Sequence, residues 1–467
     1  MNIVSLIQNE EKLRWRQMLQ CVWALSVPAI LAQVTYIVME YIDAAMVGSL
    51  GAAASASIGL VAPLLWFAYG ISSAAVQGFS VQVAQYIGAK RLVESRDTFR
   101  QGLIVVGTFS ILFSLAGIVV SPYLPGFLGA SQDIYQGAYE YFLVFMIGMP
   151  VIMLRILSTS MLQCSGSMKS VSFFNSIMCV LDIVFNFLFI FPSRLIQLWG
   201  IEFWMPGAGY GVMGAAIGSV AAETVTAVIL LYLSIIRANY LRQKFGMAWH
   251  ITKNCLKDAF KISAPIAAEQ VILSGSHVAM MIMVAPLGTV AIAANSFAIT
   301  AESLCYMPGM GIAIAAVTLV GQSIGAQKPD FAKGFAKLSV ATGMVTMGIL
   351  GAMMYVVAPW VFAFLTPVQE VQQLGTEVLR IALYAEPFFA ISIVGAGALR
   401  GARDTFCPSL INLASVWGLR MTMAFFLVTS YGLHGIWLAM CLELYVRGLL
   451  FLLRIYKQKW NNRGAVV

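Results

Sequence analysis

The chain has 467 residues, of which 60% are hydrophobic and only 10% are charged, whereas roughly 25% charged residues is usual in soluble domains. This composition excludes a soluble enzyme, a nucleic-acid-binding protein and a disordered chain, because no soluble core could cover so much apolar surface. The net charge is +8. The positions of the basic residues along the chain, described below, account for this charge without an anionic partner.

Long apolar segments, separated by charged or turn-rich breaks, follow one another along nearly the whole chain. Because about 20 apolar residues form a helix that crosses a bilayer, each segment predicts one membrane-spanning helix. We expect an all-α integral membrane protein with twelve transmembrane helices, at residues 18–46, 57–86, 98–120, 136–161, 170–192, 211–237, 258–285, 290–322, 335–358, 372–398, 408–430 and 433–456.

Lysine and arginine residues are concentrated in alternate loops. They lie in the N-terminal tail, in the loops after the second, fourth, sixth, eighth and tenth expected helices, and at the C-terminus, whereas the opposite loops contain only Arg194. Positively charged loops stay on the cytoplasmic side during insertion. We therefore predict a multi-pass membrane protein. Both termini and the 237–261 loop are expected in the cytoplasm, and the 193–206 segment outside.

The sequence repeats itself at a constant offset, the one that separates Pro28 from Pro265. The match includes Gln85–Ala89 with Gln322–Ala326, and it keeps its register without a gap as far as Asn175 with Asn412. Two six-helix repeats in the same orientation imply two lobes around a central cleft, an architecture typical of transporters. We expect an N-lobe at residues 1–240 and a C-lobe at residues 241–467.

Several segments resemble the multidrug and toxic compound extrusion (MATE) family, in its bacterial NorM/DinF-like branches. They are Asp43–Gly51, the pair Gln85–Ala89 and Gln322–Ala326, Pro265–Gln270, and Pro286–Ala291 leading to Ala301–Gly309. The resemblance covers essentially the full length and implies a transporter that uses a sodium or proton gradient to export organic cations and other amphipathic compounds. It also implies that Asp43 and Asp182 occupy the acidic positions that similar proteins use in the N-lobe.

Acidic residues inside the expected helices are candidate functional residues, because an unpaired carboxylate at membrane depth is costly. In the N-lobe, Gln33, Tyr36, Glu40 and Asp43 share one face of the first helix by their spacing, and Asn175, Asp182 and Asn186 share one face of the fifth. Neither face carries a basic residue. We predict a cation or proton site between them, with Asp43 and Asp182 as a candidate sodium site; Glu40 alone could instead be structural.

The C-lobe carries a second set of candidates, namely Glu269 and His277 on the seventh helix, Asn295 and Glu302 on the eighth, and Glu386 on the tenth. His277 could equally be a core residue. Two pairs of opposite charge, Glu443 with Arg447 and Glu377 with Arg380, are each interpreted as a salt bridge within one helix. We also expect Arg155 and Arg420 to pair across helices with acids such as Asp182 or Glu386.

The leading functional hypothesis is an ion-coupled (H⁺ or Na⁺) multidrug efflux antiporter that exports organic cations by alternating access. The alternative from the same fold is a flippase for lipid-linked oligosaccharides, which would need a cationic cavity, whereas intramembrane acids here outnumber arginines. A third possibility is a membrane scaffold or receptor. The sequence contains no P-loop, catalytic triad, metal cluster or dinucleotide fingerprint. We therefore expect no enzymatic activity and no cofactor, with small cationic or amphipathic drugs and the lipid bilayer as partners of a monomer.

Overall fold

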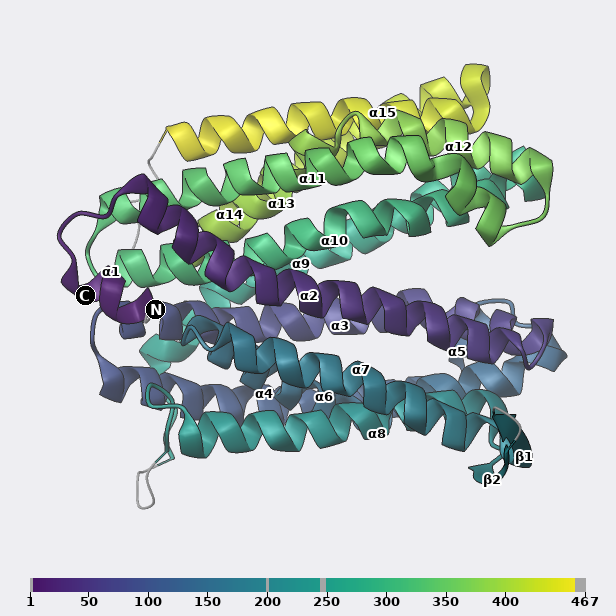
Figure 1. Ribbon diagram of the computed structural model, residues 1–467, viewed down its shortest axis with the longest axis horizontal. Coiled ribbons are helices and arrows are strands. Elements are labelled where there is room, and N and C mark those ends of the chain that lie inside the picture. Colours follow the sequence, from purple (N-terminus) through teal and green to yellow (C-terminus); the bar gives the residue numbers. More distant parts are fainter. Residues whose placement is uncertain (1–2, 199–200, 244–248, 458–467) are drawn as a thin grey trace.

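The protein is a bundle of long helices (Figure 1). The computed structural model describes residues 3–198, 201–243 and 249–457. Its elements in chain order are α1 (Ile3–Asn9), α2 (Trp15–Gly48), α3 (Ala52–Gly88), α4 (Leu92–Val120), α5 (Leu124–Phe127), α6 (Gln132–Cys164), α7 (Met168–Ile190), β1 (Pro192–Leu198), β2 (Ile201–Ala208), α8 (Gly211–Tyr232), η1 (Leu233–Arg237), α9 (Lys253–Val284), η2 (Ala285–Leu287), α10 (Thr289–Gly325), α11 (Pro329–Leu365), α12 (Gln369–Leu383), α13 (Glu386–Gly401), α14 (Phe406–Leu413), η3 (Ala414–Met421) and α15 (Thr422–Tyr456).

The described residues contain twelve spans. Ten helices are long and apolar enough to cross a membrane, and the pair α12 and α13, bent by 58°, forms another span. The helical segment Phe406–Tyr456 has 51 residues and would be about 77 Å long, more than twice the thickness of a bilayer core. Its backbone leaves the helical conformation at Gly432 (φ 56°, ψ −133°). The segment is therefore two spans, and the predicted helical membrane fold is confirmed.

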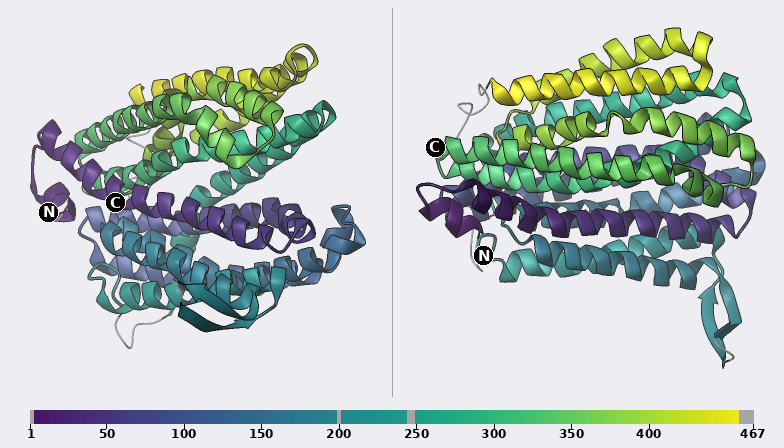
Figure 2. Two further views of the ribbon diagram at one scale, coloured as in Figure 1. Left: turned by 45° about the vertical axis from the view of Figure 1, so that its right-hand side comes forward. Right: turned by 45° about the horizontal axis from the view of Figure 1, so that its top comes forward.

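One element was not predicted from the sequence. The segment inserted between α7 and α8 forms an antiparallel hairpin of β1 and β2, which projects from one end of the bundle (Figures 1 and 2). Both termini lie at the opposite end. We call these two ends the hairpin end and the termini end.

The two halves of the chain make the same backbone turns at equivalent places. Gly51 and Gly288, which correspond in the repeat, have positive φ angles of 114° and 95°. Lys90 and Gln327, a second corresponding pair, have φ angles of 61° and 57°. Because residues other than glycine rarely adopt positive φ, the shared turn at Lys90 and Gln327 is a specific signature. The internal repeat therefore extends from the sequence to the backbone.

Helix α2 packs on a different lobe in each of its two halves. Its C-terminal half belongs to the N-lobe, where Tyr36 and Met39 contact α7 and α8. Its N-terminal half is buried among side chains of α10, α11 and α13 in the C-lobe, through Met18, Cys21, Val22 and Leu25. Pro28 lies between the two halves, and its carbonyl accepts a hydrogen bond from Ser172 Oγ at 2.5 Å.

Helix α9 repeats this arrangement in the opposite sense. Near its start, Ile262 and Ile266 pack against α3 of the N-lobe, whereas Val284 at its end lies in the C-lobe core. Pro265 lies close to the change of partner, and its carbonyl accepts a hydrogen bond from Ser409 Oγ at 2.9 Å. Each lobe is therefore connected to the other by one crossing helix with a proline near the crossing point.

The lobes meet directly at the termini end, through the repeated Gln-x-Ile-Gly-Ala segments. Gln85 Nε2 of the N-lobe donates to the backbone oxygen of Gly401 at 3.3 Å, and Gln322 Nε2 of the C-lobe donates to that of Cys164 at 2.7 Å. We call the meeting of Gln85–Gly88 with Gln322–Gly325 the junction. Its two hydrogen bonds are reciprocal, because the two segments are equivalent in the repeat.

Glycine is required at the junction for the backbones to approach. A Cβ atom at Gly88 would overlap the carbonyl oxygen of Gln322, and one at Gly325 would overlap that of Gln85. Toward the hairpin end the two groups of helices splay apart (Figure 2, left). The apolar clusters there each belong to one lobe, one containing Ala294 and Leu379 and another Val47 and Ala215. Apolar contact between the lobes is therefore concentrated at the termini end.

The short N-terminal helix α1 lies across the junction. Ile7 is buried in the C-lobe cluster and Val4 in the N-lobe cluster. Gln8 Nε2 donates to the backbone oxygen of Ile87 at 2.7 Å, and Lys328 Nζ donates to that of Ile7 at 2.8 Å. Helix α1 thus contacts both lobes where they meet.

Candidate functional site

The N-lobe candidates from two helices are brought together as predicted. Asn186 of α7 donates from Nδ2 to Asp43 Oδ1 of α2 at 2.9 Å and to Asp182 Oδ2 at 3.1 Å. Asp182 and Asn186 are buried, with 2% and 0% exposure. No basic side chain forms an ion pair with either aspartate among the described residues. The cluster therefore holds two carboxyl groups that one amide bridges.

Two further residues complete this cluster and were missed at the sequence level. Gly218 of α8 lies against Asn186, and a Cβ at this position would overlap the Asn186 side chain. The hydroxyl of Ser219 interacts with Asp182. The only signal in the sequence was the run of small residues in α8, which is common wherever membrane helices pack closely.

Other predicted N-lobe residues surround the cluster on the same two helices. Glu40 interacts with Tyr36, one turn earlier on α2. Asn175, nearer the termini end of α7, has a buried carbonyl oxygen for which the described residues provide no hydrogen-bond partner. Gln33 is half-buried on α2. The two polar faces therefore extend along α2 and α7, and hydrogen bonds join them at Asp43, Asp182 and Asn186.

Arg155 pairs with an acid of another helix, as predicted, but the two acids suggested as partners were wrong. Arg155 of α6 forms a buried ion pair with Glu223 of α8 rather than with Asp182 or Glu386, and Tyr69 of α3 interacts with the same glutamate. Because the charge of Glu223 is neutralised, this acid is not a free site for a cation. This pairing depends on how far α6 is shifted along α8 in the folded protein, which the sequence does not reveal.

The C-lobe contains two buried glutamates without a basic partner in an ion pair among the described residues. Glu386 is 1% exposed, and neither of its carboxylate oxygens has a hydrogen-bond partner there. It lies in the first turn of α13, directly after the 58° bend. Glu302 of α10 is 6% exposed and close enough for its charge to act on Glu386. The two glutamates form a group of buried acids in the C-lobe, at positions that do not correspond to Asp43 and Asp182 in the repeat.

The arginines of the C-lobe are paired close by. Glu443 accepts hydrogen bonds from Arg420 Nη2 at 2.6 Å and forms an ion pair with Arg447 Nε at 3.1 Å. The helix-internal pair of Glu443 with Arg447 is therefore confirmed. Arg420 pairs across helices, as predicted, but with Glu443 rather than with the suggested acids. The two arginines share one carboxylate, and both are near enough to Glu302 to act on its charge.

The second predicted helix-internal pair was wrong. Glu377 pairs with His434 at 2.9 Å, and Arg380 Nε donates to the backbone oxygen of Tyr355 at 3.2 Å. The bend between α12 and α13 and the approach of α15 decide these contacts, and neither is visible as a helical spacing.

The remaining C-lobe candidates lie in different surroundings. Glu269 of α9 is buried and fully engaged, because Arg400 Nη2 (2.9 Å), Ser409 Oγ (3.0 Å) and Asn412 Nδ2 (2.6 Å) all donate to it. Asn295 accepts a hydrogen bond from Trp437 Nε1 at 3.0 Å. His277 is exposed. The structure therefore places Glu269 in a network of its own rather than beside Glu302 and Glu386.

Tyr306 of α10 connects the two groups of acids. It lies close enough to Glu302, Glu40 and Glu386 for all three charges to act on it, and Glu40 belongs to the other lobe. Its ring packs on Phe389 with centroids 5.6 Å apart. Sequence reasoning missed this tyrosine, because an aromatic residue in a long apolar helix carries no distinguishing signal.

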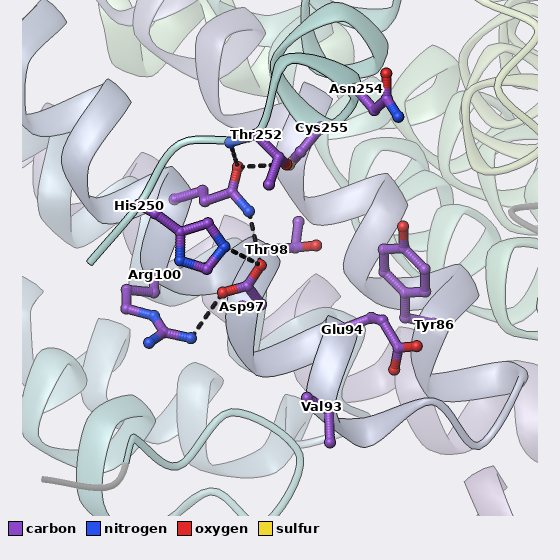
Figure 3. A pocket seen from close by; sticks show the side chains of 11 residues that line it. Tyr86, Val93, Glu94, Asp97, Thr98, Arg100, His250, Thr252, Asn254 and Cys255 are labelled. Carbon is purple, nitrogen blue, oxygen red and sulfur yellow. Dashed lines mark hydrogen bonds and ion pairs between the residues drawn. The ribbon is translucent and has the colours of Figure 1, made fainter. Parts of the chain in front are cut away.

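A separate pocket of about 530 Å³ lies at the termini end between α3, α4 and the start of α9 (Figure 3). Its polar groups interact with one another. Asp97 accepts from Arg100 (2.7 Å) and Gln101 (2.8 Å) and faces His250 at 3.7 Å, and Gln101 Oε1 accepts from the Thr252 backbone at 2.9 Å. These contacts anchor the linker between the lobes on α4.

The fold defines a two-lobed helical membrane transporter, and each lobe contains buried acids that form no described ion pair with a basic residue. Comparison with known proteins agrees with this class. The MatE family model matches the chain twice, over residues 28–188 and 265–426, and the two matches begin at Pro28 and Pro265, which are equivalent positions of the internal repeat. The chain belongs to the MatE family, as its resemblance to the multidrug and toxic compound extrusion proteins predicted.

Curated relatives match nearly end to end. A probable multidrug resistance protein NorM of Thermotoga maritima is 25% identical over 450 residues, which cover 95% of this chain and 93% of the relative. A probable multidrug resistance protein NorM of Idiomarina loihiensis is 25% identical over 447 residues, with 92% of each chain covered.

Solved structures share the fold. An outward-facing multidrug resistance MATE family transporter of the MOP superfamily superposes with a TM-score of 0.87 at 18% identity, covering 98% of this chain and 99% of that one. The Vibrio cholerae MATE transporter VcmN in its bent form gives a TM-score of 0.84 at 16% identity, covering 95% and 97%. At this identity the likeness concerns the fold alone.

Proposed function

We propose that this protein is an ion-coupled antiporter that exports cationic, amphipathic compounds, including drugs, by alternating access. The observation that carries the proposal is the contact of Asp43 and Asp182 through Asn186 without a basic partner in the described ion pairs. The names of the NorM relatives support multidrug resistance as the biological role. No catalytic step and no cofactor is part of this function.

A cationic cargo fits the charges that remain unpaired inside the lobes. Three arginines inside the lobes are paired with acids, Arg155 with Glu223 and both Arg420 and Arg447 with Glu443. The acids without a basic partner in a described ion pair are Glu40, Asp43, Asp182, Glu302 and Glu386. A buried carboxylate without a partner favours a bound cation or proton over the empty ionised state. A flippase for pyrophosphate-linked lipids would instead need an excess of unpaired basic residues over unpaired acids inside the lobes.

The coupling ion in this proposal is a proton held by the N-lobe pair. The Asn186 amide turns its NH₂ group toward both carboxylates, so that its carbonyl oxygen is not available to a sodium ion between them. Two carboxyl groups bridged by one amide favour one shared proton, because the repulsion between two neighbouring negative charges disfavours ionisation of both groups. A proton on this pair would reduce its attraction for a cationic drug. Proton and drug then weaken each other's binding, and this coupling is reciprocal.

Alternating access would use the junction and the two crossing helices. The lobes meet at the termini end and splay toward the hairpin end (Figure 2). In this proposal the protein lies in a bacterial cytoplasmic (inner) membrane with the termini end in the cytoplasm, which the distribution of basic loops supports. In that orientation the present arrangement is closed toward the cytoplasm. Separation of Gln85 from Gly401 and of Gln322 from Cys164 would open the cytoplasmic side, while α2 and α9 keep the lobes connected.

The test is transport by purified protein in liposomes, with a proton gradient and a sodium gradient imposed separately. We expect a proton gradient alone to drive export of an ethidium-like cation. Asp43→Asn keeps the size of the side chain but removes the charge, and it should abolish gradient-driven transport. Asp133→Asn, at an exposed position in the first turn of α6, is the matched control and should transport normally.

Three outcomes would contradict the proposal. Wild-type transport by Asp43→Asn would transfer the coupling role to the C-lobe acids Glu302 and Glu386. Transport driven by sodium alone would overturn the proton as coupling ion. Movement of a pyrophosphate-linked lipid without any cation flux would favour the flippase.

A further inference from the structure

A groove of about 660 Å³ runs along the outer face of α2 at the termini end, and two cationic side chains line it. One is Arg16 in the first turn of α2, and the other is Lys169 in the first turn of α7. None of the lining residues is acidic, and neither cation forms a described ion pair with a carboxylate. The groove therefore has a net charge of +2 at its polar end.

A tryptophan places this polar end at the boundary between water and lipid. Trp15, the first residue of α2, lines the groove with 62% exposure, and tryptophan is enriched where membrane proteins cross the headgroup region. The Arg16 guanidinium lies over the Trp15 ring, 5.5 Å from its centroid. This contact holds the charge at the rim of the groove.

An apolar track leads from the cations toward the middle of the membrane. Leu19, Trp23 and Val27 line the groove in sequence, and the exposed Leu31 continues the same face of α2. The helical rise from Arg16 to Val27 is about 16 Å, close to the thickness of about 15 Å of one leaflet's hydrocarbon region. A charged end and an apolar end are thus separated by the length of a lipid acyl chain.

We propose that this groove binds an anionic phospholipid, with its phosphate between Arg16 and Lys169 and one acyl chain along Leu19, Trp23 and Val27. Basic pockets between membrane helices are recognised by anionic headgroups. The bound phosphate would connect α7 of the N-lobe to the half of α2 that packs on the C-lobe. The site depends on the protein spanning a bilayer and not on which compound it transports.

The experiment uses the full-length protein in nanodiscs of phosphatidylcholine with increasing fractions of brominated phosphatidylglycerol. Bromine quenches nearby indoles, so Trp15 and Trp23 report occupancy, and Trp15→Phe/Trp23→Phe identifies their share of the signal. We expect saturable quenching in the wild type. In Arg16→Gln/Lys169→Gln, half-saturation should require about 30-fold more anionic lipid, the weakening expected for two lost attractions to a phosphate. Arg237→Gln/Arg242→Gln removes the same charge from exposed positions at the same end and should leave the midpoint unchanged.

Each result decides the proposal in one direction. Equal midpoints in the wild type and in Arg16→Gln/Lys169→Gln would overturn it, as would equal quenching by brominated phosphatidylcholine. In detergent, inorganic phosphate that displaces the brominated lipid at millimolar concentration would overturn a lipid in favour of a free anion. Failure of phosphate to compete, together with the shift in the double variant, supports the phospholipid.

Discussion

The contact of the two lobes at the junction can be tested with a single methyl group. Gly88 lies so close to the backbone of the opposite lobe that an added Cβ would overlap the carbonyl oxygen of Gln322. The same Cβ would lie only 2.9 Å from the Cα of Gln322. The obstacle is backbone, so no side-chain rotation can relieve it. Gly88→Ala should therefore force the junction apart, whereas the helix itself should tolerate alanine.

The size of the effect follows from packing energetics. Overpacking in a tight contact costs about 1–3 kcal/mol, and here the cost applies only to the state in which the junction is closed. At about 1.4 kcal/mol per factor of ten, the equilibrium should shift toward the open junction by about 5- to 150-fold. Gly325→Ala should shift it in the same direction, because its Cβ would overlap the backbone of Gln85.

Native Cys164 provides the assay. It is 3% exposed, and its backbone oxygen accepts the hydrogen bond from Gln322 at the junction, so its thiol should react faster as the junction opens. We would retain Cys164 as the only cysteine and measure maleimide labelling in Gly88→Ala. Gly59→Ala on the same helix is the control, because a Cβ at this position meets no atom within 4 Å.

A second reporter separates opening of the junction from unfolding. Cys179 is buried within the N-lobe, in the cluster of Met39 and Met178. In a second protein that retains Cys179 as the only cysteine, this thiol should stay unreactive in Gly88→Ala if only the junction opens. Wild-type labelling of Cys164 in a folded Gly88→Ala protein would refute the reasoning, and equal acceleration at Cys164 and Cys179 would show global destabilisation instead.

Three further predictions concern stability, α1 and orientation. Arg155→Gln should lower the free energy of unfolding by about 3–5 kcal/mol, because it leaves the buried Glu223 carboxylate unpaired, and Arg155→Met/Glu223→Leu should recover most of the loss in a thermal denaturation series. Ile7→Asp places a charge in the buried position that α1 occupies across the junction and should raise Cys164 labelling, whereas an unchanged rate would show that α1 does not hold the lobes together. In a cysteine-free background, Trp204→Cys in strand β2 of the hairpin should be labelled in intact cells, and Trp249→Cys in the linker only after permeabilisation; the reverse pattern would overturn the orientation.

The sequence by itself determined the helices, the repeat and the family. These are local or one-dimensional properties, because hydrophobic length defines a span and the constant offset between Pro28 and Pro265 defines the repeat. The sequence also predicted correctly that Asp43 and Asp182 lie close together. Polar residues on one face of an apolar helix lower the free-energy cost of their place in the membrane when they face polar residues of another helix.

Tertiary structure alone decided which charges are neutralised. Arg155 forms an ion pair with Glu223, and Arg400 forms one with Glu269; in each pair the two residues lie on helices far apart in the chain. These choices depend on the relative shift of packed helices, for which residue spacing carries no information. Whether an intramembrane acid is a salt bridge or a free site for a cation is therefore decided by packing, because only packing determines which charge lies beside it.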